Sequence, residues 1–407
     1  MKSEWKVYSV QELIDLDMLE EPMDGNHGGI HPKTSDYVSS GVPFIMANNL
    51  SNGKVDYDNC AFISEQQATT LRKGFAHPGD VLLTHKATIG RTAIVGDEYD
   101  TIILTPQVTY YRVKHGISNR YLKYYFDSSE FQQTLSNWAG SGSTRAYLGI
   151  TAQRKLPIVL PPMETQEKIA GLCGALDEKI YLNNAINNNL LEQVLTLYRN
   201  RFVDTVNDER RICRADEYFD ISIGKTPPRK EPQWFSTNPQ DVTWVSISDM
   251  GTCGLYISSS SEQLTREAVD RHNVKVVPDN TVLLSFKLTV GRIAITNGEM
   301  TTNEAIAHFK TDKKEINEYL YCYLKCFNYQ TMGSTSSIAT AVNSKIIKGM
   351  PFVVPTDNEL KEFHDLAAPM FANIKANQIE TDNLVALRDT LLPKLMSGEL
   401  DVSDIDL

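Results

Sequence analysis

Residues 81–95 read VLLTHKATIGRTAIV, and residues 282–296 read VLLSFKLTVGRIAIT. Nine of the fifteen positions are identical, where chance would supply about one. Weaker matches extend the repeat in both directions, because residues 42–45 resemble 242–245 and residues 157–161 resemble 351–355. The period of about 200 residues indicates a duplicated domain, since the repeats of solenoid proteins are only about 20–50 residues long.

The elements of each copy can be predicted from short apolar runs. Runs of β-branched or aromatic residues bounded by Gly, Pro, Asn or Asp are typical of strands. In the first copy such runs stand at 42–46, 81–84, 93–95 and 109–113. Ser64 with Glu65 predicts the start of one helix, and a second helix is expected from about Asn119 to Leu135. Each copy is therefore expected to be a mixed α/β domain rich in loops.

A long helical pattern follows each copy. Between residues 163 and 204 there is no proline, and apolar residues recur at steps of three and four. The second pattern contains Pro369, which is expected to kink or restart that helix. Two such helices in one chain most simply pair as an antiparallel coiled coil. The expected seam residues are Ile169, Leu172, Leu176, Ile180, Asn183, Ile186, Leu190, Val194 and Leu197 in the first helix, and Phe363, Ala367, Met370, Ile374, Asn377, Thr381, Leu384, Leu387 and Leu391 in the second.

Asn183 and Asn377 occupy equivalent positions in the two patterns. A polar residue in a seam commonly fixes the register of two helices at some cost in stability. The other interpretation, an asparagine that faces solvent, stays open. The repeat and the helical patterns together predict four segments: a first domain at 1–160, a first helix at 161–206, a second domain at 207–356, and a second helix with its tail at 357–407.

Composition places the chain in a broad class. Of its 407 residues, 41% are hydrophobic and 22% charged, which is ordinary for a soluble globular protein and excludes collagenous, disordered and disulfide-scaffold classes. No run approaches the ~18–20 consecutive apolar residues of a membrane helix, and the N-terminus lacks the apolar core of a signal peptide. The six cysteines include no CxxC pair, which suits reduced thiols and argues against a zinc site. We therefore expect a cytoplasmic protein.

The formal net charge of −11 counts against a nucleic-acid partner when the chain is taken whole. Its distribution changes that conclusion. Residues 357–407 hold 4 basic and 11 acidic groups, whereas residues 207–356 hold 17 of each. Most of the acidic excess therefore lies in the last segment. Residues 25–160 hold 13 basic and 10 acidic groups, so a local basic face on the first domain is compatible with the sequence.

Known catalytic motifs are not matched. Gly224-Lys225-Thr226 resembles the end of a phosphate-binding loop, but Phe219 stands where the first glycine belongs and two prolines follow where a helix should begin. The eight histidines show no metal-ligand spacing, and no motif of a base methyltransferase is present. We expect no catalytic residue, no metal site and no cofactor in this chain.

A pair of equivalent loops combines Lys, Thr, Gly and Arg. Such a loop can bind DNA phosphates, because the cations neutralise charge and Gly lets backbone N–H groups approach. An ordinary β-turn with solvated cations explains it equally well, and both interpretations stay open. The candidate residues are Lys86, Thr88, Gly90 and Arg91 in the first copy, and Lys287, Thr289, Gly291 and Arg292 in the second.

Two polar loops precede the long helices. They either contact a DNA backbone or serve as linkers, and the sequence leaves both interpretations open. Their candidate residues are Ser141, Ser143, Thr144 and Arg145 in the first copy, and Ser334, Thr335 and Ser336 in the second.

Several motifs occur in a fixed order along the chain. From the N-terminus they are GDVLLT at 79–84 with Gly90-Arg91, LPIVLPP at 156–162, GKTP at 224–227, WVSISD at 244–249, and LRDTLLPKLMSGEL at 387–400. In this order, and over essentially its full length, the chain resembles the specificity subunits of Type I DNA restriction-modification systems. The first domain departs from the pattern, since it carries Asp24-Gly25-Asn26-His27-Gly28 in place of Gly-Lys-Thr-Pro.

The resemblance implies an α+β fold of two target-recognition domains separated by two long antiparallel coiled-coil helices. Each domain would read one part of a bipartite, asymmetric double-stranded DNA target. The helices would space the two parts and dock two methylation subunits. The residues that the periodicity assigns to the helix seam or to this docking are Ile169, Leu172, Leu176, Ile180, Asn183, Leu190, Ile374, Asn377, Leu384 and Leu391.

The resemblance also implies a chain without catalysis of its own. S-adenosylmethionine, ATP and Mg²⁺ would belong to the partner methylation and restriction subunits, which act in phage defence. The alternative is a tandem-repeat scaffold that joins proteins and never meets DNA, for which the net charge of −11 is the best support.

Overall fold

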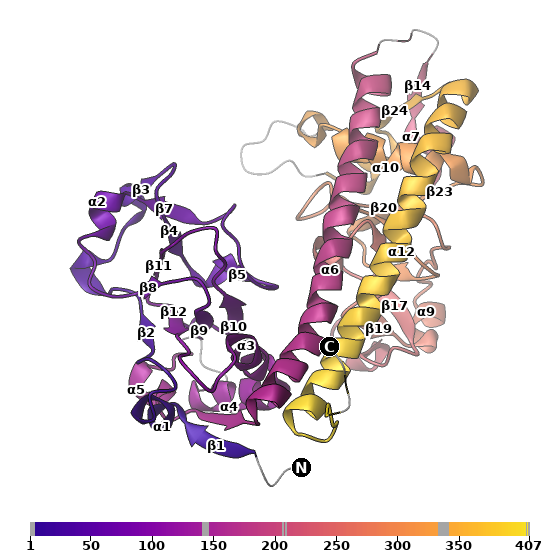
Figure 1. The fold of residues 1–407 in the computed structure, drawn as a ribbon. Helices are drawn as coiled ribbons and strands as arrows, with labels where there is room; N and C mark the ends of the chain where they lie inside the picture. The colour runs from indigo at the N-terminus through magenta and orange to yellow at the C-terminus, as the bar shows by residue number, and fades with distance from the viewer. Residues whose placement is uncertain are drawn as a thin grey trace. The chain divides into compact units, whose positions relative to one another are not determined.

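The structure is a computed structural model that describes residues 5–140, 146–205, 207, 210–332, 342–403 and 405. The chain divides into two units. Unit 1 comprises residues 1–180 and 383–407, and unit 2 comprises residues 181–382. Each unit contains one mixed α/β domain and a part of each long helix, α6 (Met163–Tyr198) and α12 (Asp357–Met396), as the colours in Figure 1 show.

Unit 1 is built on two mixed sheets and a separate antiparallel pair of strands. The first sheet has the order β2-β12-β9-β10-β6-β5 and the second the order β3-β7-β4-β11-β8, while β1 pairs with β13. The strands are β1 (Lys6–Ser9), β2 (Met23–Asp24), β3 (Tyr37–Val38), β4 (Val42–Ile45), β5 (Leu50–Ser51), β6 (Gly53–Val55), β7 (Ala61–Ile63), β8 (Phe75–Ala76), β9 (Val81–Lys86), β10 (Thr88–Ile94), β11 (Ile102–Leu104), β12 (Val108–Tyr111) and β13 (Pro157–Leu160). The short helices are α1 (Val10–Asp15), α2 (Glu65–Ala68), α3 (Asn119–Asp127), α4 (Ser129–Trp138) and α5 (Ile150–Gln153).

Unit 2 repeats this arrangement. Its sheets have the orders β15-β23-β20-β21-β18 and β16-β19-β17-β22, and β14 pairs with β24. The strands are β14 (Arg211–Arg214), β15 (Asp220–Ile223), β16 (Phe235–Ser236), β17 (Val242–Val245), β18 (Tyr256–Ile257), β19 (Gln263–Leu264), β20 (Val282–Ser285), β21 (Ile293–Thr296), β22 (Thr301–Thr302), β23 (Ile306–Lys310) and β24 (Pro351–Val354). The helices are α7 (Ala215–Tyr218), α8 (Asp249–Thr252), α9 (Arg266–Arg271), α10 (Asn317–Cys326) and α11 (Ser344–Lys348). The strand order confirms a duplicated mixed α/β domain.

The strands predicted from apolar runs are confirmed. Residues 42–46, 81–84 and 109–113 coincide with β4, β9 and β12, and residues 93–95 end β10. Most of these side chains are buried, because β9 and β12 lie inside the first sheet, where both faces are covered. Continuous apolar runs of four to six residues are what such strands require.

The helix predictions are right in one case and wrong in the other. Ser64 caps α2, and its Oγ accepts a hydrogen bond from the N–H of Gln67, as expected. The single helix expected from Asn119 to Leu135 is in fact two helices, α3 and α4, which meet at Ser128. Ser128 has extended backbone angles and its Oγ accepts from the N–H of Phe131, so it ends one helix and caps the next.

Equivalent tyrosines tie a helix to the last strand of each domain. In unit 1, Tyr121 on α3 donates to the carbonyl of Val159 at 2.8 Å. In unit 2, Tyr319 on α10 donates to the carbonyl of Val353 at 2.7 Å. Because each strand leads directly into a long helix, this bond fixes the helix to its domain.

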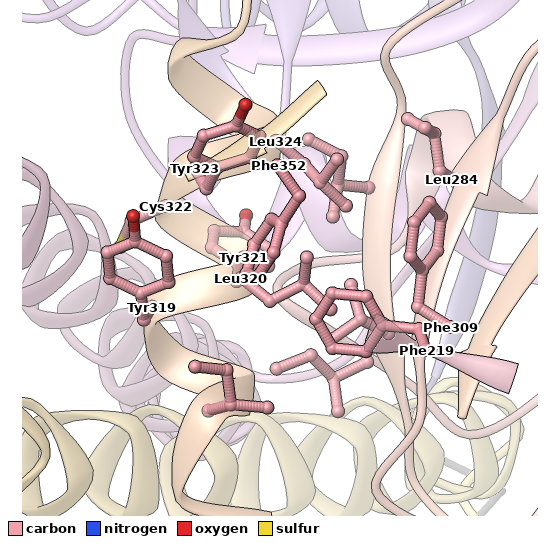
Figure 2. Close-up of a cluster of buried hydrophobic side chains, with 14 of the residues drawn as sticks. Phe219, Leu284, Phe309, Tyr319, Leu320, Tyr321, Cys322, Tyr323, Leu324 and Phe352 are labelled. Atoms are coloured by element: carbon pink, nitrogen blue, oxygen red, sulfur yellow. The ribbon is translucent and has the colours of Figure 1, made fainter. Parts of the chain in front are cut away.

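Aromatic side chains fill the core beside this bond. Figure 2 shows the cluster in unit 2, where Phe219 and Phe309 lie against each other and Tyr323 lies beside Phe352. The ring centroids of Phe219 and Phe309 are 5.7 Å apart, and those of Tyr323 and Phe352 are 5.2 Å apart. Val194 and Phe363 from the two long helices belong to the same buried cluster, so unit 2 folds around its own parts of α6 and α12.

The long helices pair antiparallel, as predicted. In unit 2, Arg201 contacts Glu362, and Asn187 contacts Asn377, so residue numbers rise along one helix as they fall along the other. In unit 1, Asp177 accepts from Arg388 at 2.8 Å. The helix does not restart at Pro369, because α12 is one helix throughout. The restart is therefore wrong, and the kink stays a prediction. Tertiary packing on both sides of the proline, at Ala367 and Phe371, compensates for the missing N–H.

The seam contains both asparagines. Asn183 is buried, and its Nδ2 donates to Glu380 at 2.8 Å and to Thr381 at 3.4 Å. Asn377 is partly buried and donates to Asn187 at 2.9 Å, so the seam interpretation holds for both. Ile186 was expected in the seam but is 48% exposed, and Leu387 is 46% exposed, so these two expectations are wrong. Asn187 faces the partner helix in place of Ile186. Because successive residues are turned by about 100° around a helix axis, Ile186 then faces away from the seam.

Candidate nucleic-acid interface

The predicted loop of unit 1 is the tip of the hairpin formed by β9 and β10. Lys86 pairs with Thr88 across the tip, and Ala87 stands at the apex with a φ of +64°. All three side chains are exposed. The N–H of Ala87 donates to the carbonyl of Ala146 at 3.1 Å, and Lys86 lies 5.9 Å from the ring of Tyr147. The structure therefore brings Lys86 and Thr88 together at one exposed point.

The equivalent loop of unit 2 joins β20 to β21. Lys287, Leu288 and Thr289 form its tip and are all exposed, while Leu288 has a φ of +59°. The N–H of Thr289 donates to the carbonyl of Lys287 at 2.6 Å, which closes a tight three-residue turn. The structure therefore brings Lys287 and Thr289 together as it does their counterparts in unit 1.

The two glycines of the loops are required by their positions. Gly90 has a φ of +90° and Gly291 a φ of +91°, a region that favours glycine. A side chain at Gly90 would also meet Gln132, whose Nε2 donates to the Gly90 carbonyl at 2.9 Å. At Gly291 a side chain would meet the ring of Tyr329. These glycines shape the loop.

The two arginines make equivalent internal contacts. The backbone N–H of Arg91 donates to Thr84 Oγ1 at 2.9 Å, and its guanidinium reaches the carbonyl of Ala47 at 3.4 Å. In unit 2, the N–H of Arg292 donates to Ser285 Oγ at 3.0 Å, and its guanidinium donates to the carbonyl of Ile247 at 2.6 Å. Each arginine thus fastens a hairpin to the loop after a strand of the other sheet. A role for them in binding DNA stays a prediction.

The polar loops before the long helices are not placed. Their candidate residues all lie outside the part of the chain that the structure describes, namely Ser141, Ser143, Thr144, Arg145, Ser334, Thr335 and Ser336. Their role as DNA contacts also stays a prediction.

A second pair of equivalent loops went unpredicted as a site. Gly25 and Gly224 each lie where the backbone passes directly over a strand of the second sheet. A Cβ atom would stand 1.9 Å from the Leu104 carbonyl at Gly25, and 2.2 Å from the Asn303 carbonyl at Gly224. The two segments were matched in the sequence, but the close approach of each glycine to a carbonyl is visible only in the folded chain.

The residues after these glycines carry different chemistry. In unit 2, Lys225 donates to the carbonyl of His272 at 2.6 Å, and Thr226 donates to Glu304. Burial raises the pKa of Glu304, but the hydrogen bond from Thr226 and the charge of Lys287 more than offset this, and the pKa is lowered. Glu304 is therefore anionic near the tip and opposes part of the positive charge of Lys287.

Unit 1 places a polar cluster beneath its tip. Asp24 is buried and accepts hydrogen bonds from Lys73 and from His27, the latter at 2.8 Å. Burial opposes its ionisation, yet these bonds outweigh burial and the pKa of Asp24 is lowered. His85 lies 4.0 Å from Asp24, and its Nδ1 is hydrogen-bonded to the carbonyl of Leu148 at 2.9 Å. Burial lowers the pKa of His85, so this ring is neutral near pH 7.

The polar groups of the described residues include candidates for binding anions. Within those residues no group of three His, Cys, Asp or Glu side chains is arranged to hold a metal ion. The carboxylate of Asp24 is neutralised by Lys73, which leaves it weak as a general base. What the tips present are exposed cations and hydroxyls on rigid hairpins, a set that suits DNA phosphates.

Comparison with known proteins decides the family. A family model described as the Type I restriction modification DNA specificity domain matches residues 2–192 and 209–381. The chain belongs to this family. The resemblance seen in the sequence is thus confirmed, and DNA specificity is the role that the family assigns to its members.

Relatives of the specificity family match nearly the whole chain. The chain is 26% identical to the MjaIX Type I restriction enzyme specificity subunit of Methanocaldococcus jannaschii, over 93% of this chain and 91% of that protein. It is 21% identical to the HindI specificity subunit of Haemophilus influenzae, over 88% of this chain and 94% of that protein.

One solved structure supports the same fold. The crystal structure of the Type I restriction-modification S subunit from M. genitalium is similar with a TM-score of 0.54 and 13% identity, over 96% of both chains. At this identity the likeness concerns the fold alone, which it confirms.

Among the described helices, none has the length and apolarity of a bilayer-crossing segment.

Proposed function

We propose that this member of the specificity family reads a bipartite, asymmetric DNA target, with one half-site for each domain. The observation that carries the proposal is the pair of equivalent hairpin tips, at Lys86–Thr88 and Lys287–Thr289. They share one backbone frame, in which a residue with positive φ stands between Lys and Thr, but the residue at the apex differs. Equal frames suit two half-sites of one duplex. Different residues at the apex and beneath it mean that the two half-sites differ.

The candidate contacts to DNA are those of the two tips and the two polar loops. Lys86 and Lys287 are exposed and stand beside exposed threonines, so they can neutralise phosphates while the hydroxyls donate to them. Arg91 and Arg292 are proposed to hold the hairpins in place and to reach phosphates with their remaining N–H groups. The serines at 141, 143 and 334, with their neighbours, complete the proposed surface.

The long helices are proposed to dock two methylation subunits and to set the spacing between half-sites. In unit 2 they present apolar side chains to solvent, since Tyr181, Leu182, Ile186 and Ile379 are each more than 40% exposed. A groove of about 540 Å³ lies on the same helices, between residues 189–197 of α6 and Leu366 and Met370 of α12. Exposed apolar residues beside a groove are typical of protein-binding surfaces.

Catalysis is assigned to partner subunits. Methylation with S-adenosylmethionine and ATP-driven restriction would be carried out by the methylation and restriction subunits, to which this chain contributes the choice of DNA sequence. The support comes from the sequence, in which no catalytic motif is matched, and from the family, whose description names DNA specificity. The purified chain should accordingly show no turnover.

Co-expression tests the proposed function. The full chain is expressed with the methylation subunit encoded beside it, and modified bases are mapped by long-read sequencing with and without this chain. The proposal expects one gapped, asymmetric methylated sequence that disappears without the chain. Methylation that is unchanged without the chain would refute the proposal and favour the protein scaffold that never meets DNA.

A further inference from the structure

The most exposed apolar residue in the described part of the chain is Leu288. Its side chain is 100% exposed, whereas the next large apolar residue, Ile212, is 68% exposed. Leu288 stands at the apex of the loop between β20 and β21, with Lys287 and Thr289 on either side. A leucine with its whole surface in water contributes no apolar burial to the stability of the fold.

The backbone at Leu288 is strained. Its φ of +59° is the left-handed region that residues with a side chain rarely adopt. The N–H of Thr289 donates to the carbonyl of Lys287 at 2.6 Å, so Leu288 is the middle residue of a γ-turn, and γ-turns with positive φ are rare. Such strain persists only where the surroundings enforce it, and it is concentrated at functional sites.

The surroundings of Leu288 do enforce the turn. Ser285 Oγ donates to the carbonyl of Thr289 at 2.6 Å and accepts from the N–H of Arg292 at 3.0 Å. The N–H of Gly291 donates to the carbonyl of Ser285 at 3.0 Å, and the N–H of Phe286 donates to the carbonyl of Ala305 at 2.9 Å. Phe286 points into the core and is buried. The loop is therefore a rigid support that holds one leucine outward.

The neighbours of Leu288 favour DNA as its partner. Only one apolar side chain projects from the tip, and its neighbours are a cation and a hydroxyl, whereas a protein interface needs an apolar core of several side chains. Proteins that bend DNA insert single apolar wedges, leucine among them, between base steps while cations hold the adjacent phosphates. Lys287 and Thr289 are placed to hold those phosphates.

We propose that Leu288 inserts between neighbouring base pairs of the half-site that unit 2 reads and unstacks them. The proposal rests on the function proposed above, because it requires that unit 2 bind DNA. It also names a difference between the two domains: the equivalent apex residue of unit 1 is Ala87, with a φ of +64° and the same exposed position. Ala87 has the same backbone position, but its methyl group is too short to insert, so the base pairs of the first half-site stay stacked.

The test uses the assembled complex with its methylation subunits and a duplex that carries the mapped target. 2-Aminopurine, which fluoresces when unstacked, replaces one purine of the second half-site at a time. The methylated adenine is left out, because methyltransferases flip their target base. The variants are Leu288→Ala, Leu288→Met, which keeps a long apolar side chain, and Ile212→Ala, which removes an exposed apolar side chain of unit 2 outside the tip.

One step of the second half-site should become severalfold brighter on binding of the wild type and of Leu288→Met. Leu288→Ala should lose that increase, and Ile212→Ala should keep it. An abasic nucleotide at the same step should strengthen binding by the wild type, by up to about tenfold, because the unstacking is done beforehand. Leu288→Ala should gain much less from it.

Two results would overturn the insertion while leaving the proposed function standing. One is a complex that methylates its target and shows no fluorescence change that depends on Leu288. The other is a Leu288→Ala chain that no longer assembles with the methylation subunit, since Leu288 would then contact protein. A wild-type complex without sequence-specific methylation would instead overturn the proposed function, and the insertion with it.

Discussion

The hairpin tips of the two domains share one frame and differ at the apex. In both, a residue with positive φ stands between Lys and Thr, and an arginine N–H is held by a hydroxyl, from Thr84 or from Ser285. The apex is Ala87 in unit 1 and a fully exposed Leu288 in unit 2. The difference teaches that the duplicated backbone fixes the position of the apex residue. The identity of that residue, alanine or leucine, then decides which side chain can contact DNA.

The same contrast continues beneath the tips. His85 in unit 1 lies over a buried Asp24 and its polar partners, whereas the equivalent Phe286 in unit 2 lies in an apolar core. A buried polar cluster ties unit 1 together by hydrogen bonds and charge, and unit 2 relies on aromatic packing at that place. Variants that act on the shared frame should therefore affect both domains alike, and variants outside it should affect only one.

The largest effect is expected at the shared close approach of Gly25 and Gly224. Alanine at either position would put a Cβ atom within 2.2 Å of a backbone carbonyl, so each change should destabilise its own unit by at least about 2 kcal/mol. Thermal unfolding measures this. Gly29→Ala is the control, because nothing lies within 4 Å of that position and no loss is expected. A Gly25→Ala chain as stable as Gly29→Ala would contradict the close approach.

The long helices are the part that both domains share, and lengthening α6 should change the target without changing either half-site. Four helix-forming residues inserted between Asn189 and Leu190 add about 6 Å with about 40° of residual rotation. Since base pairs lie about 3.4 Å apart along each strand, the spacer should grow by one or two pairs. Methylation mapping reads this directly. An unchanged spacer in an active complex would show that the helices do not set the distance.

Acid should weaken unit 2 through His308. The ring lies 3.0 Å from Ser222 Oγ and 2.7 Å from Thr302 Oγ1, and burial lowers its pKa to about 3. Below pH ~6.5 the unfolded chain binds a proton here that the folded chain does not, so stability falls as the pH drops toward 3, by up to about 1.4 kcal/mol per pH unit. The wild type should lose stability faster than His308→Gln over this range. Equal slopes for both proteins would disprove this.

The smallest effect separates the two arginines. Arg292 donates to a carbonyl at 2.6 Å and is partly buried, whereas the contact of Arg91 is 3.4 Å long and more exposed. Arg292→Ala should therefore cost about 1 kcal/mol, and Arg91→Ala less than about 0.5 kcal/mol. Denaturant unfolding of both variants, side by side, checks the order. A larger loss of unfolding free energy for Arg91→Ala than for Arg292→Ala would contradict the prediction that Arg292 holds its hairpin more strongly.

The sequence allowed much of the fold to be predicted, because the repeat at 81–95 and 282–296 marks two copies and buried strands need continuous apolar runs. The break between α3 and α4 escaped prediction because Ser128 supports either a turn or a helix until tertiary packing chooses. The continuity of α12 escaped it because packing on both sides overrides one proline.

The candidate site was predicted in part. The loops that bring Lys and Thr together were predicted, because loop residues at equivalent places in a repeat stand out, and their contact with DNA stays a prediction. The internal roles of Arg91 and Arg292 could not be found, since their acceptors are carbonyls far away in the sequence. The exposed Leu288 was also missed as a contact, because only the cations, hydroxyls and glycine of its loop pointed to DNA, and its positive φ is visible only in the folded chain.

Exchange of one domain tests the central claim most directly. Residues 207–356 are replaced by the corresponding domain of another specificity subunit, the chain is co-expressed with its methylation subunit, and the methylated sites are mapped. The account predicts that one half-site changes, while the other half-site and the spacer stay as they were. Loss of both half-sites in a folded, assembled complex, or a target that does not change at all, would contradict it.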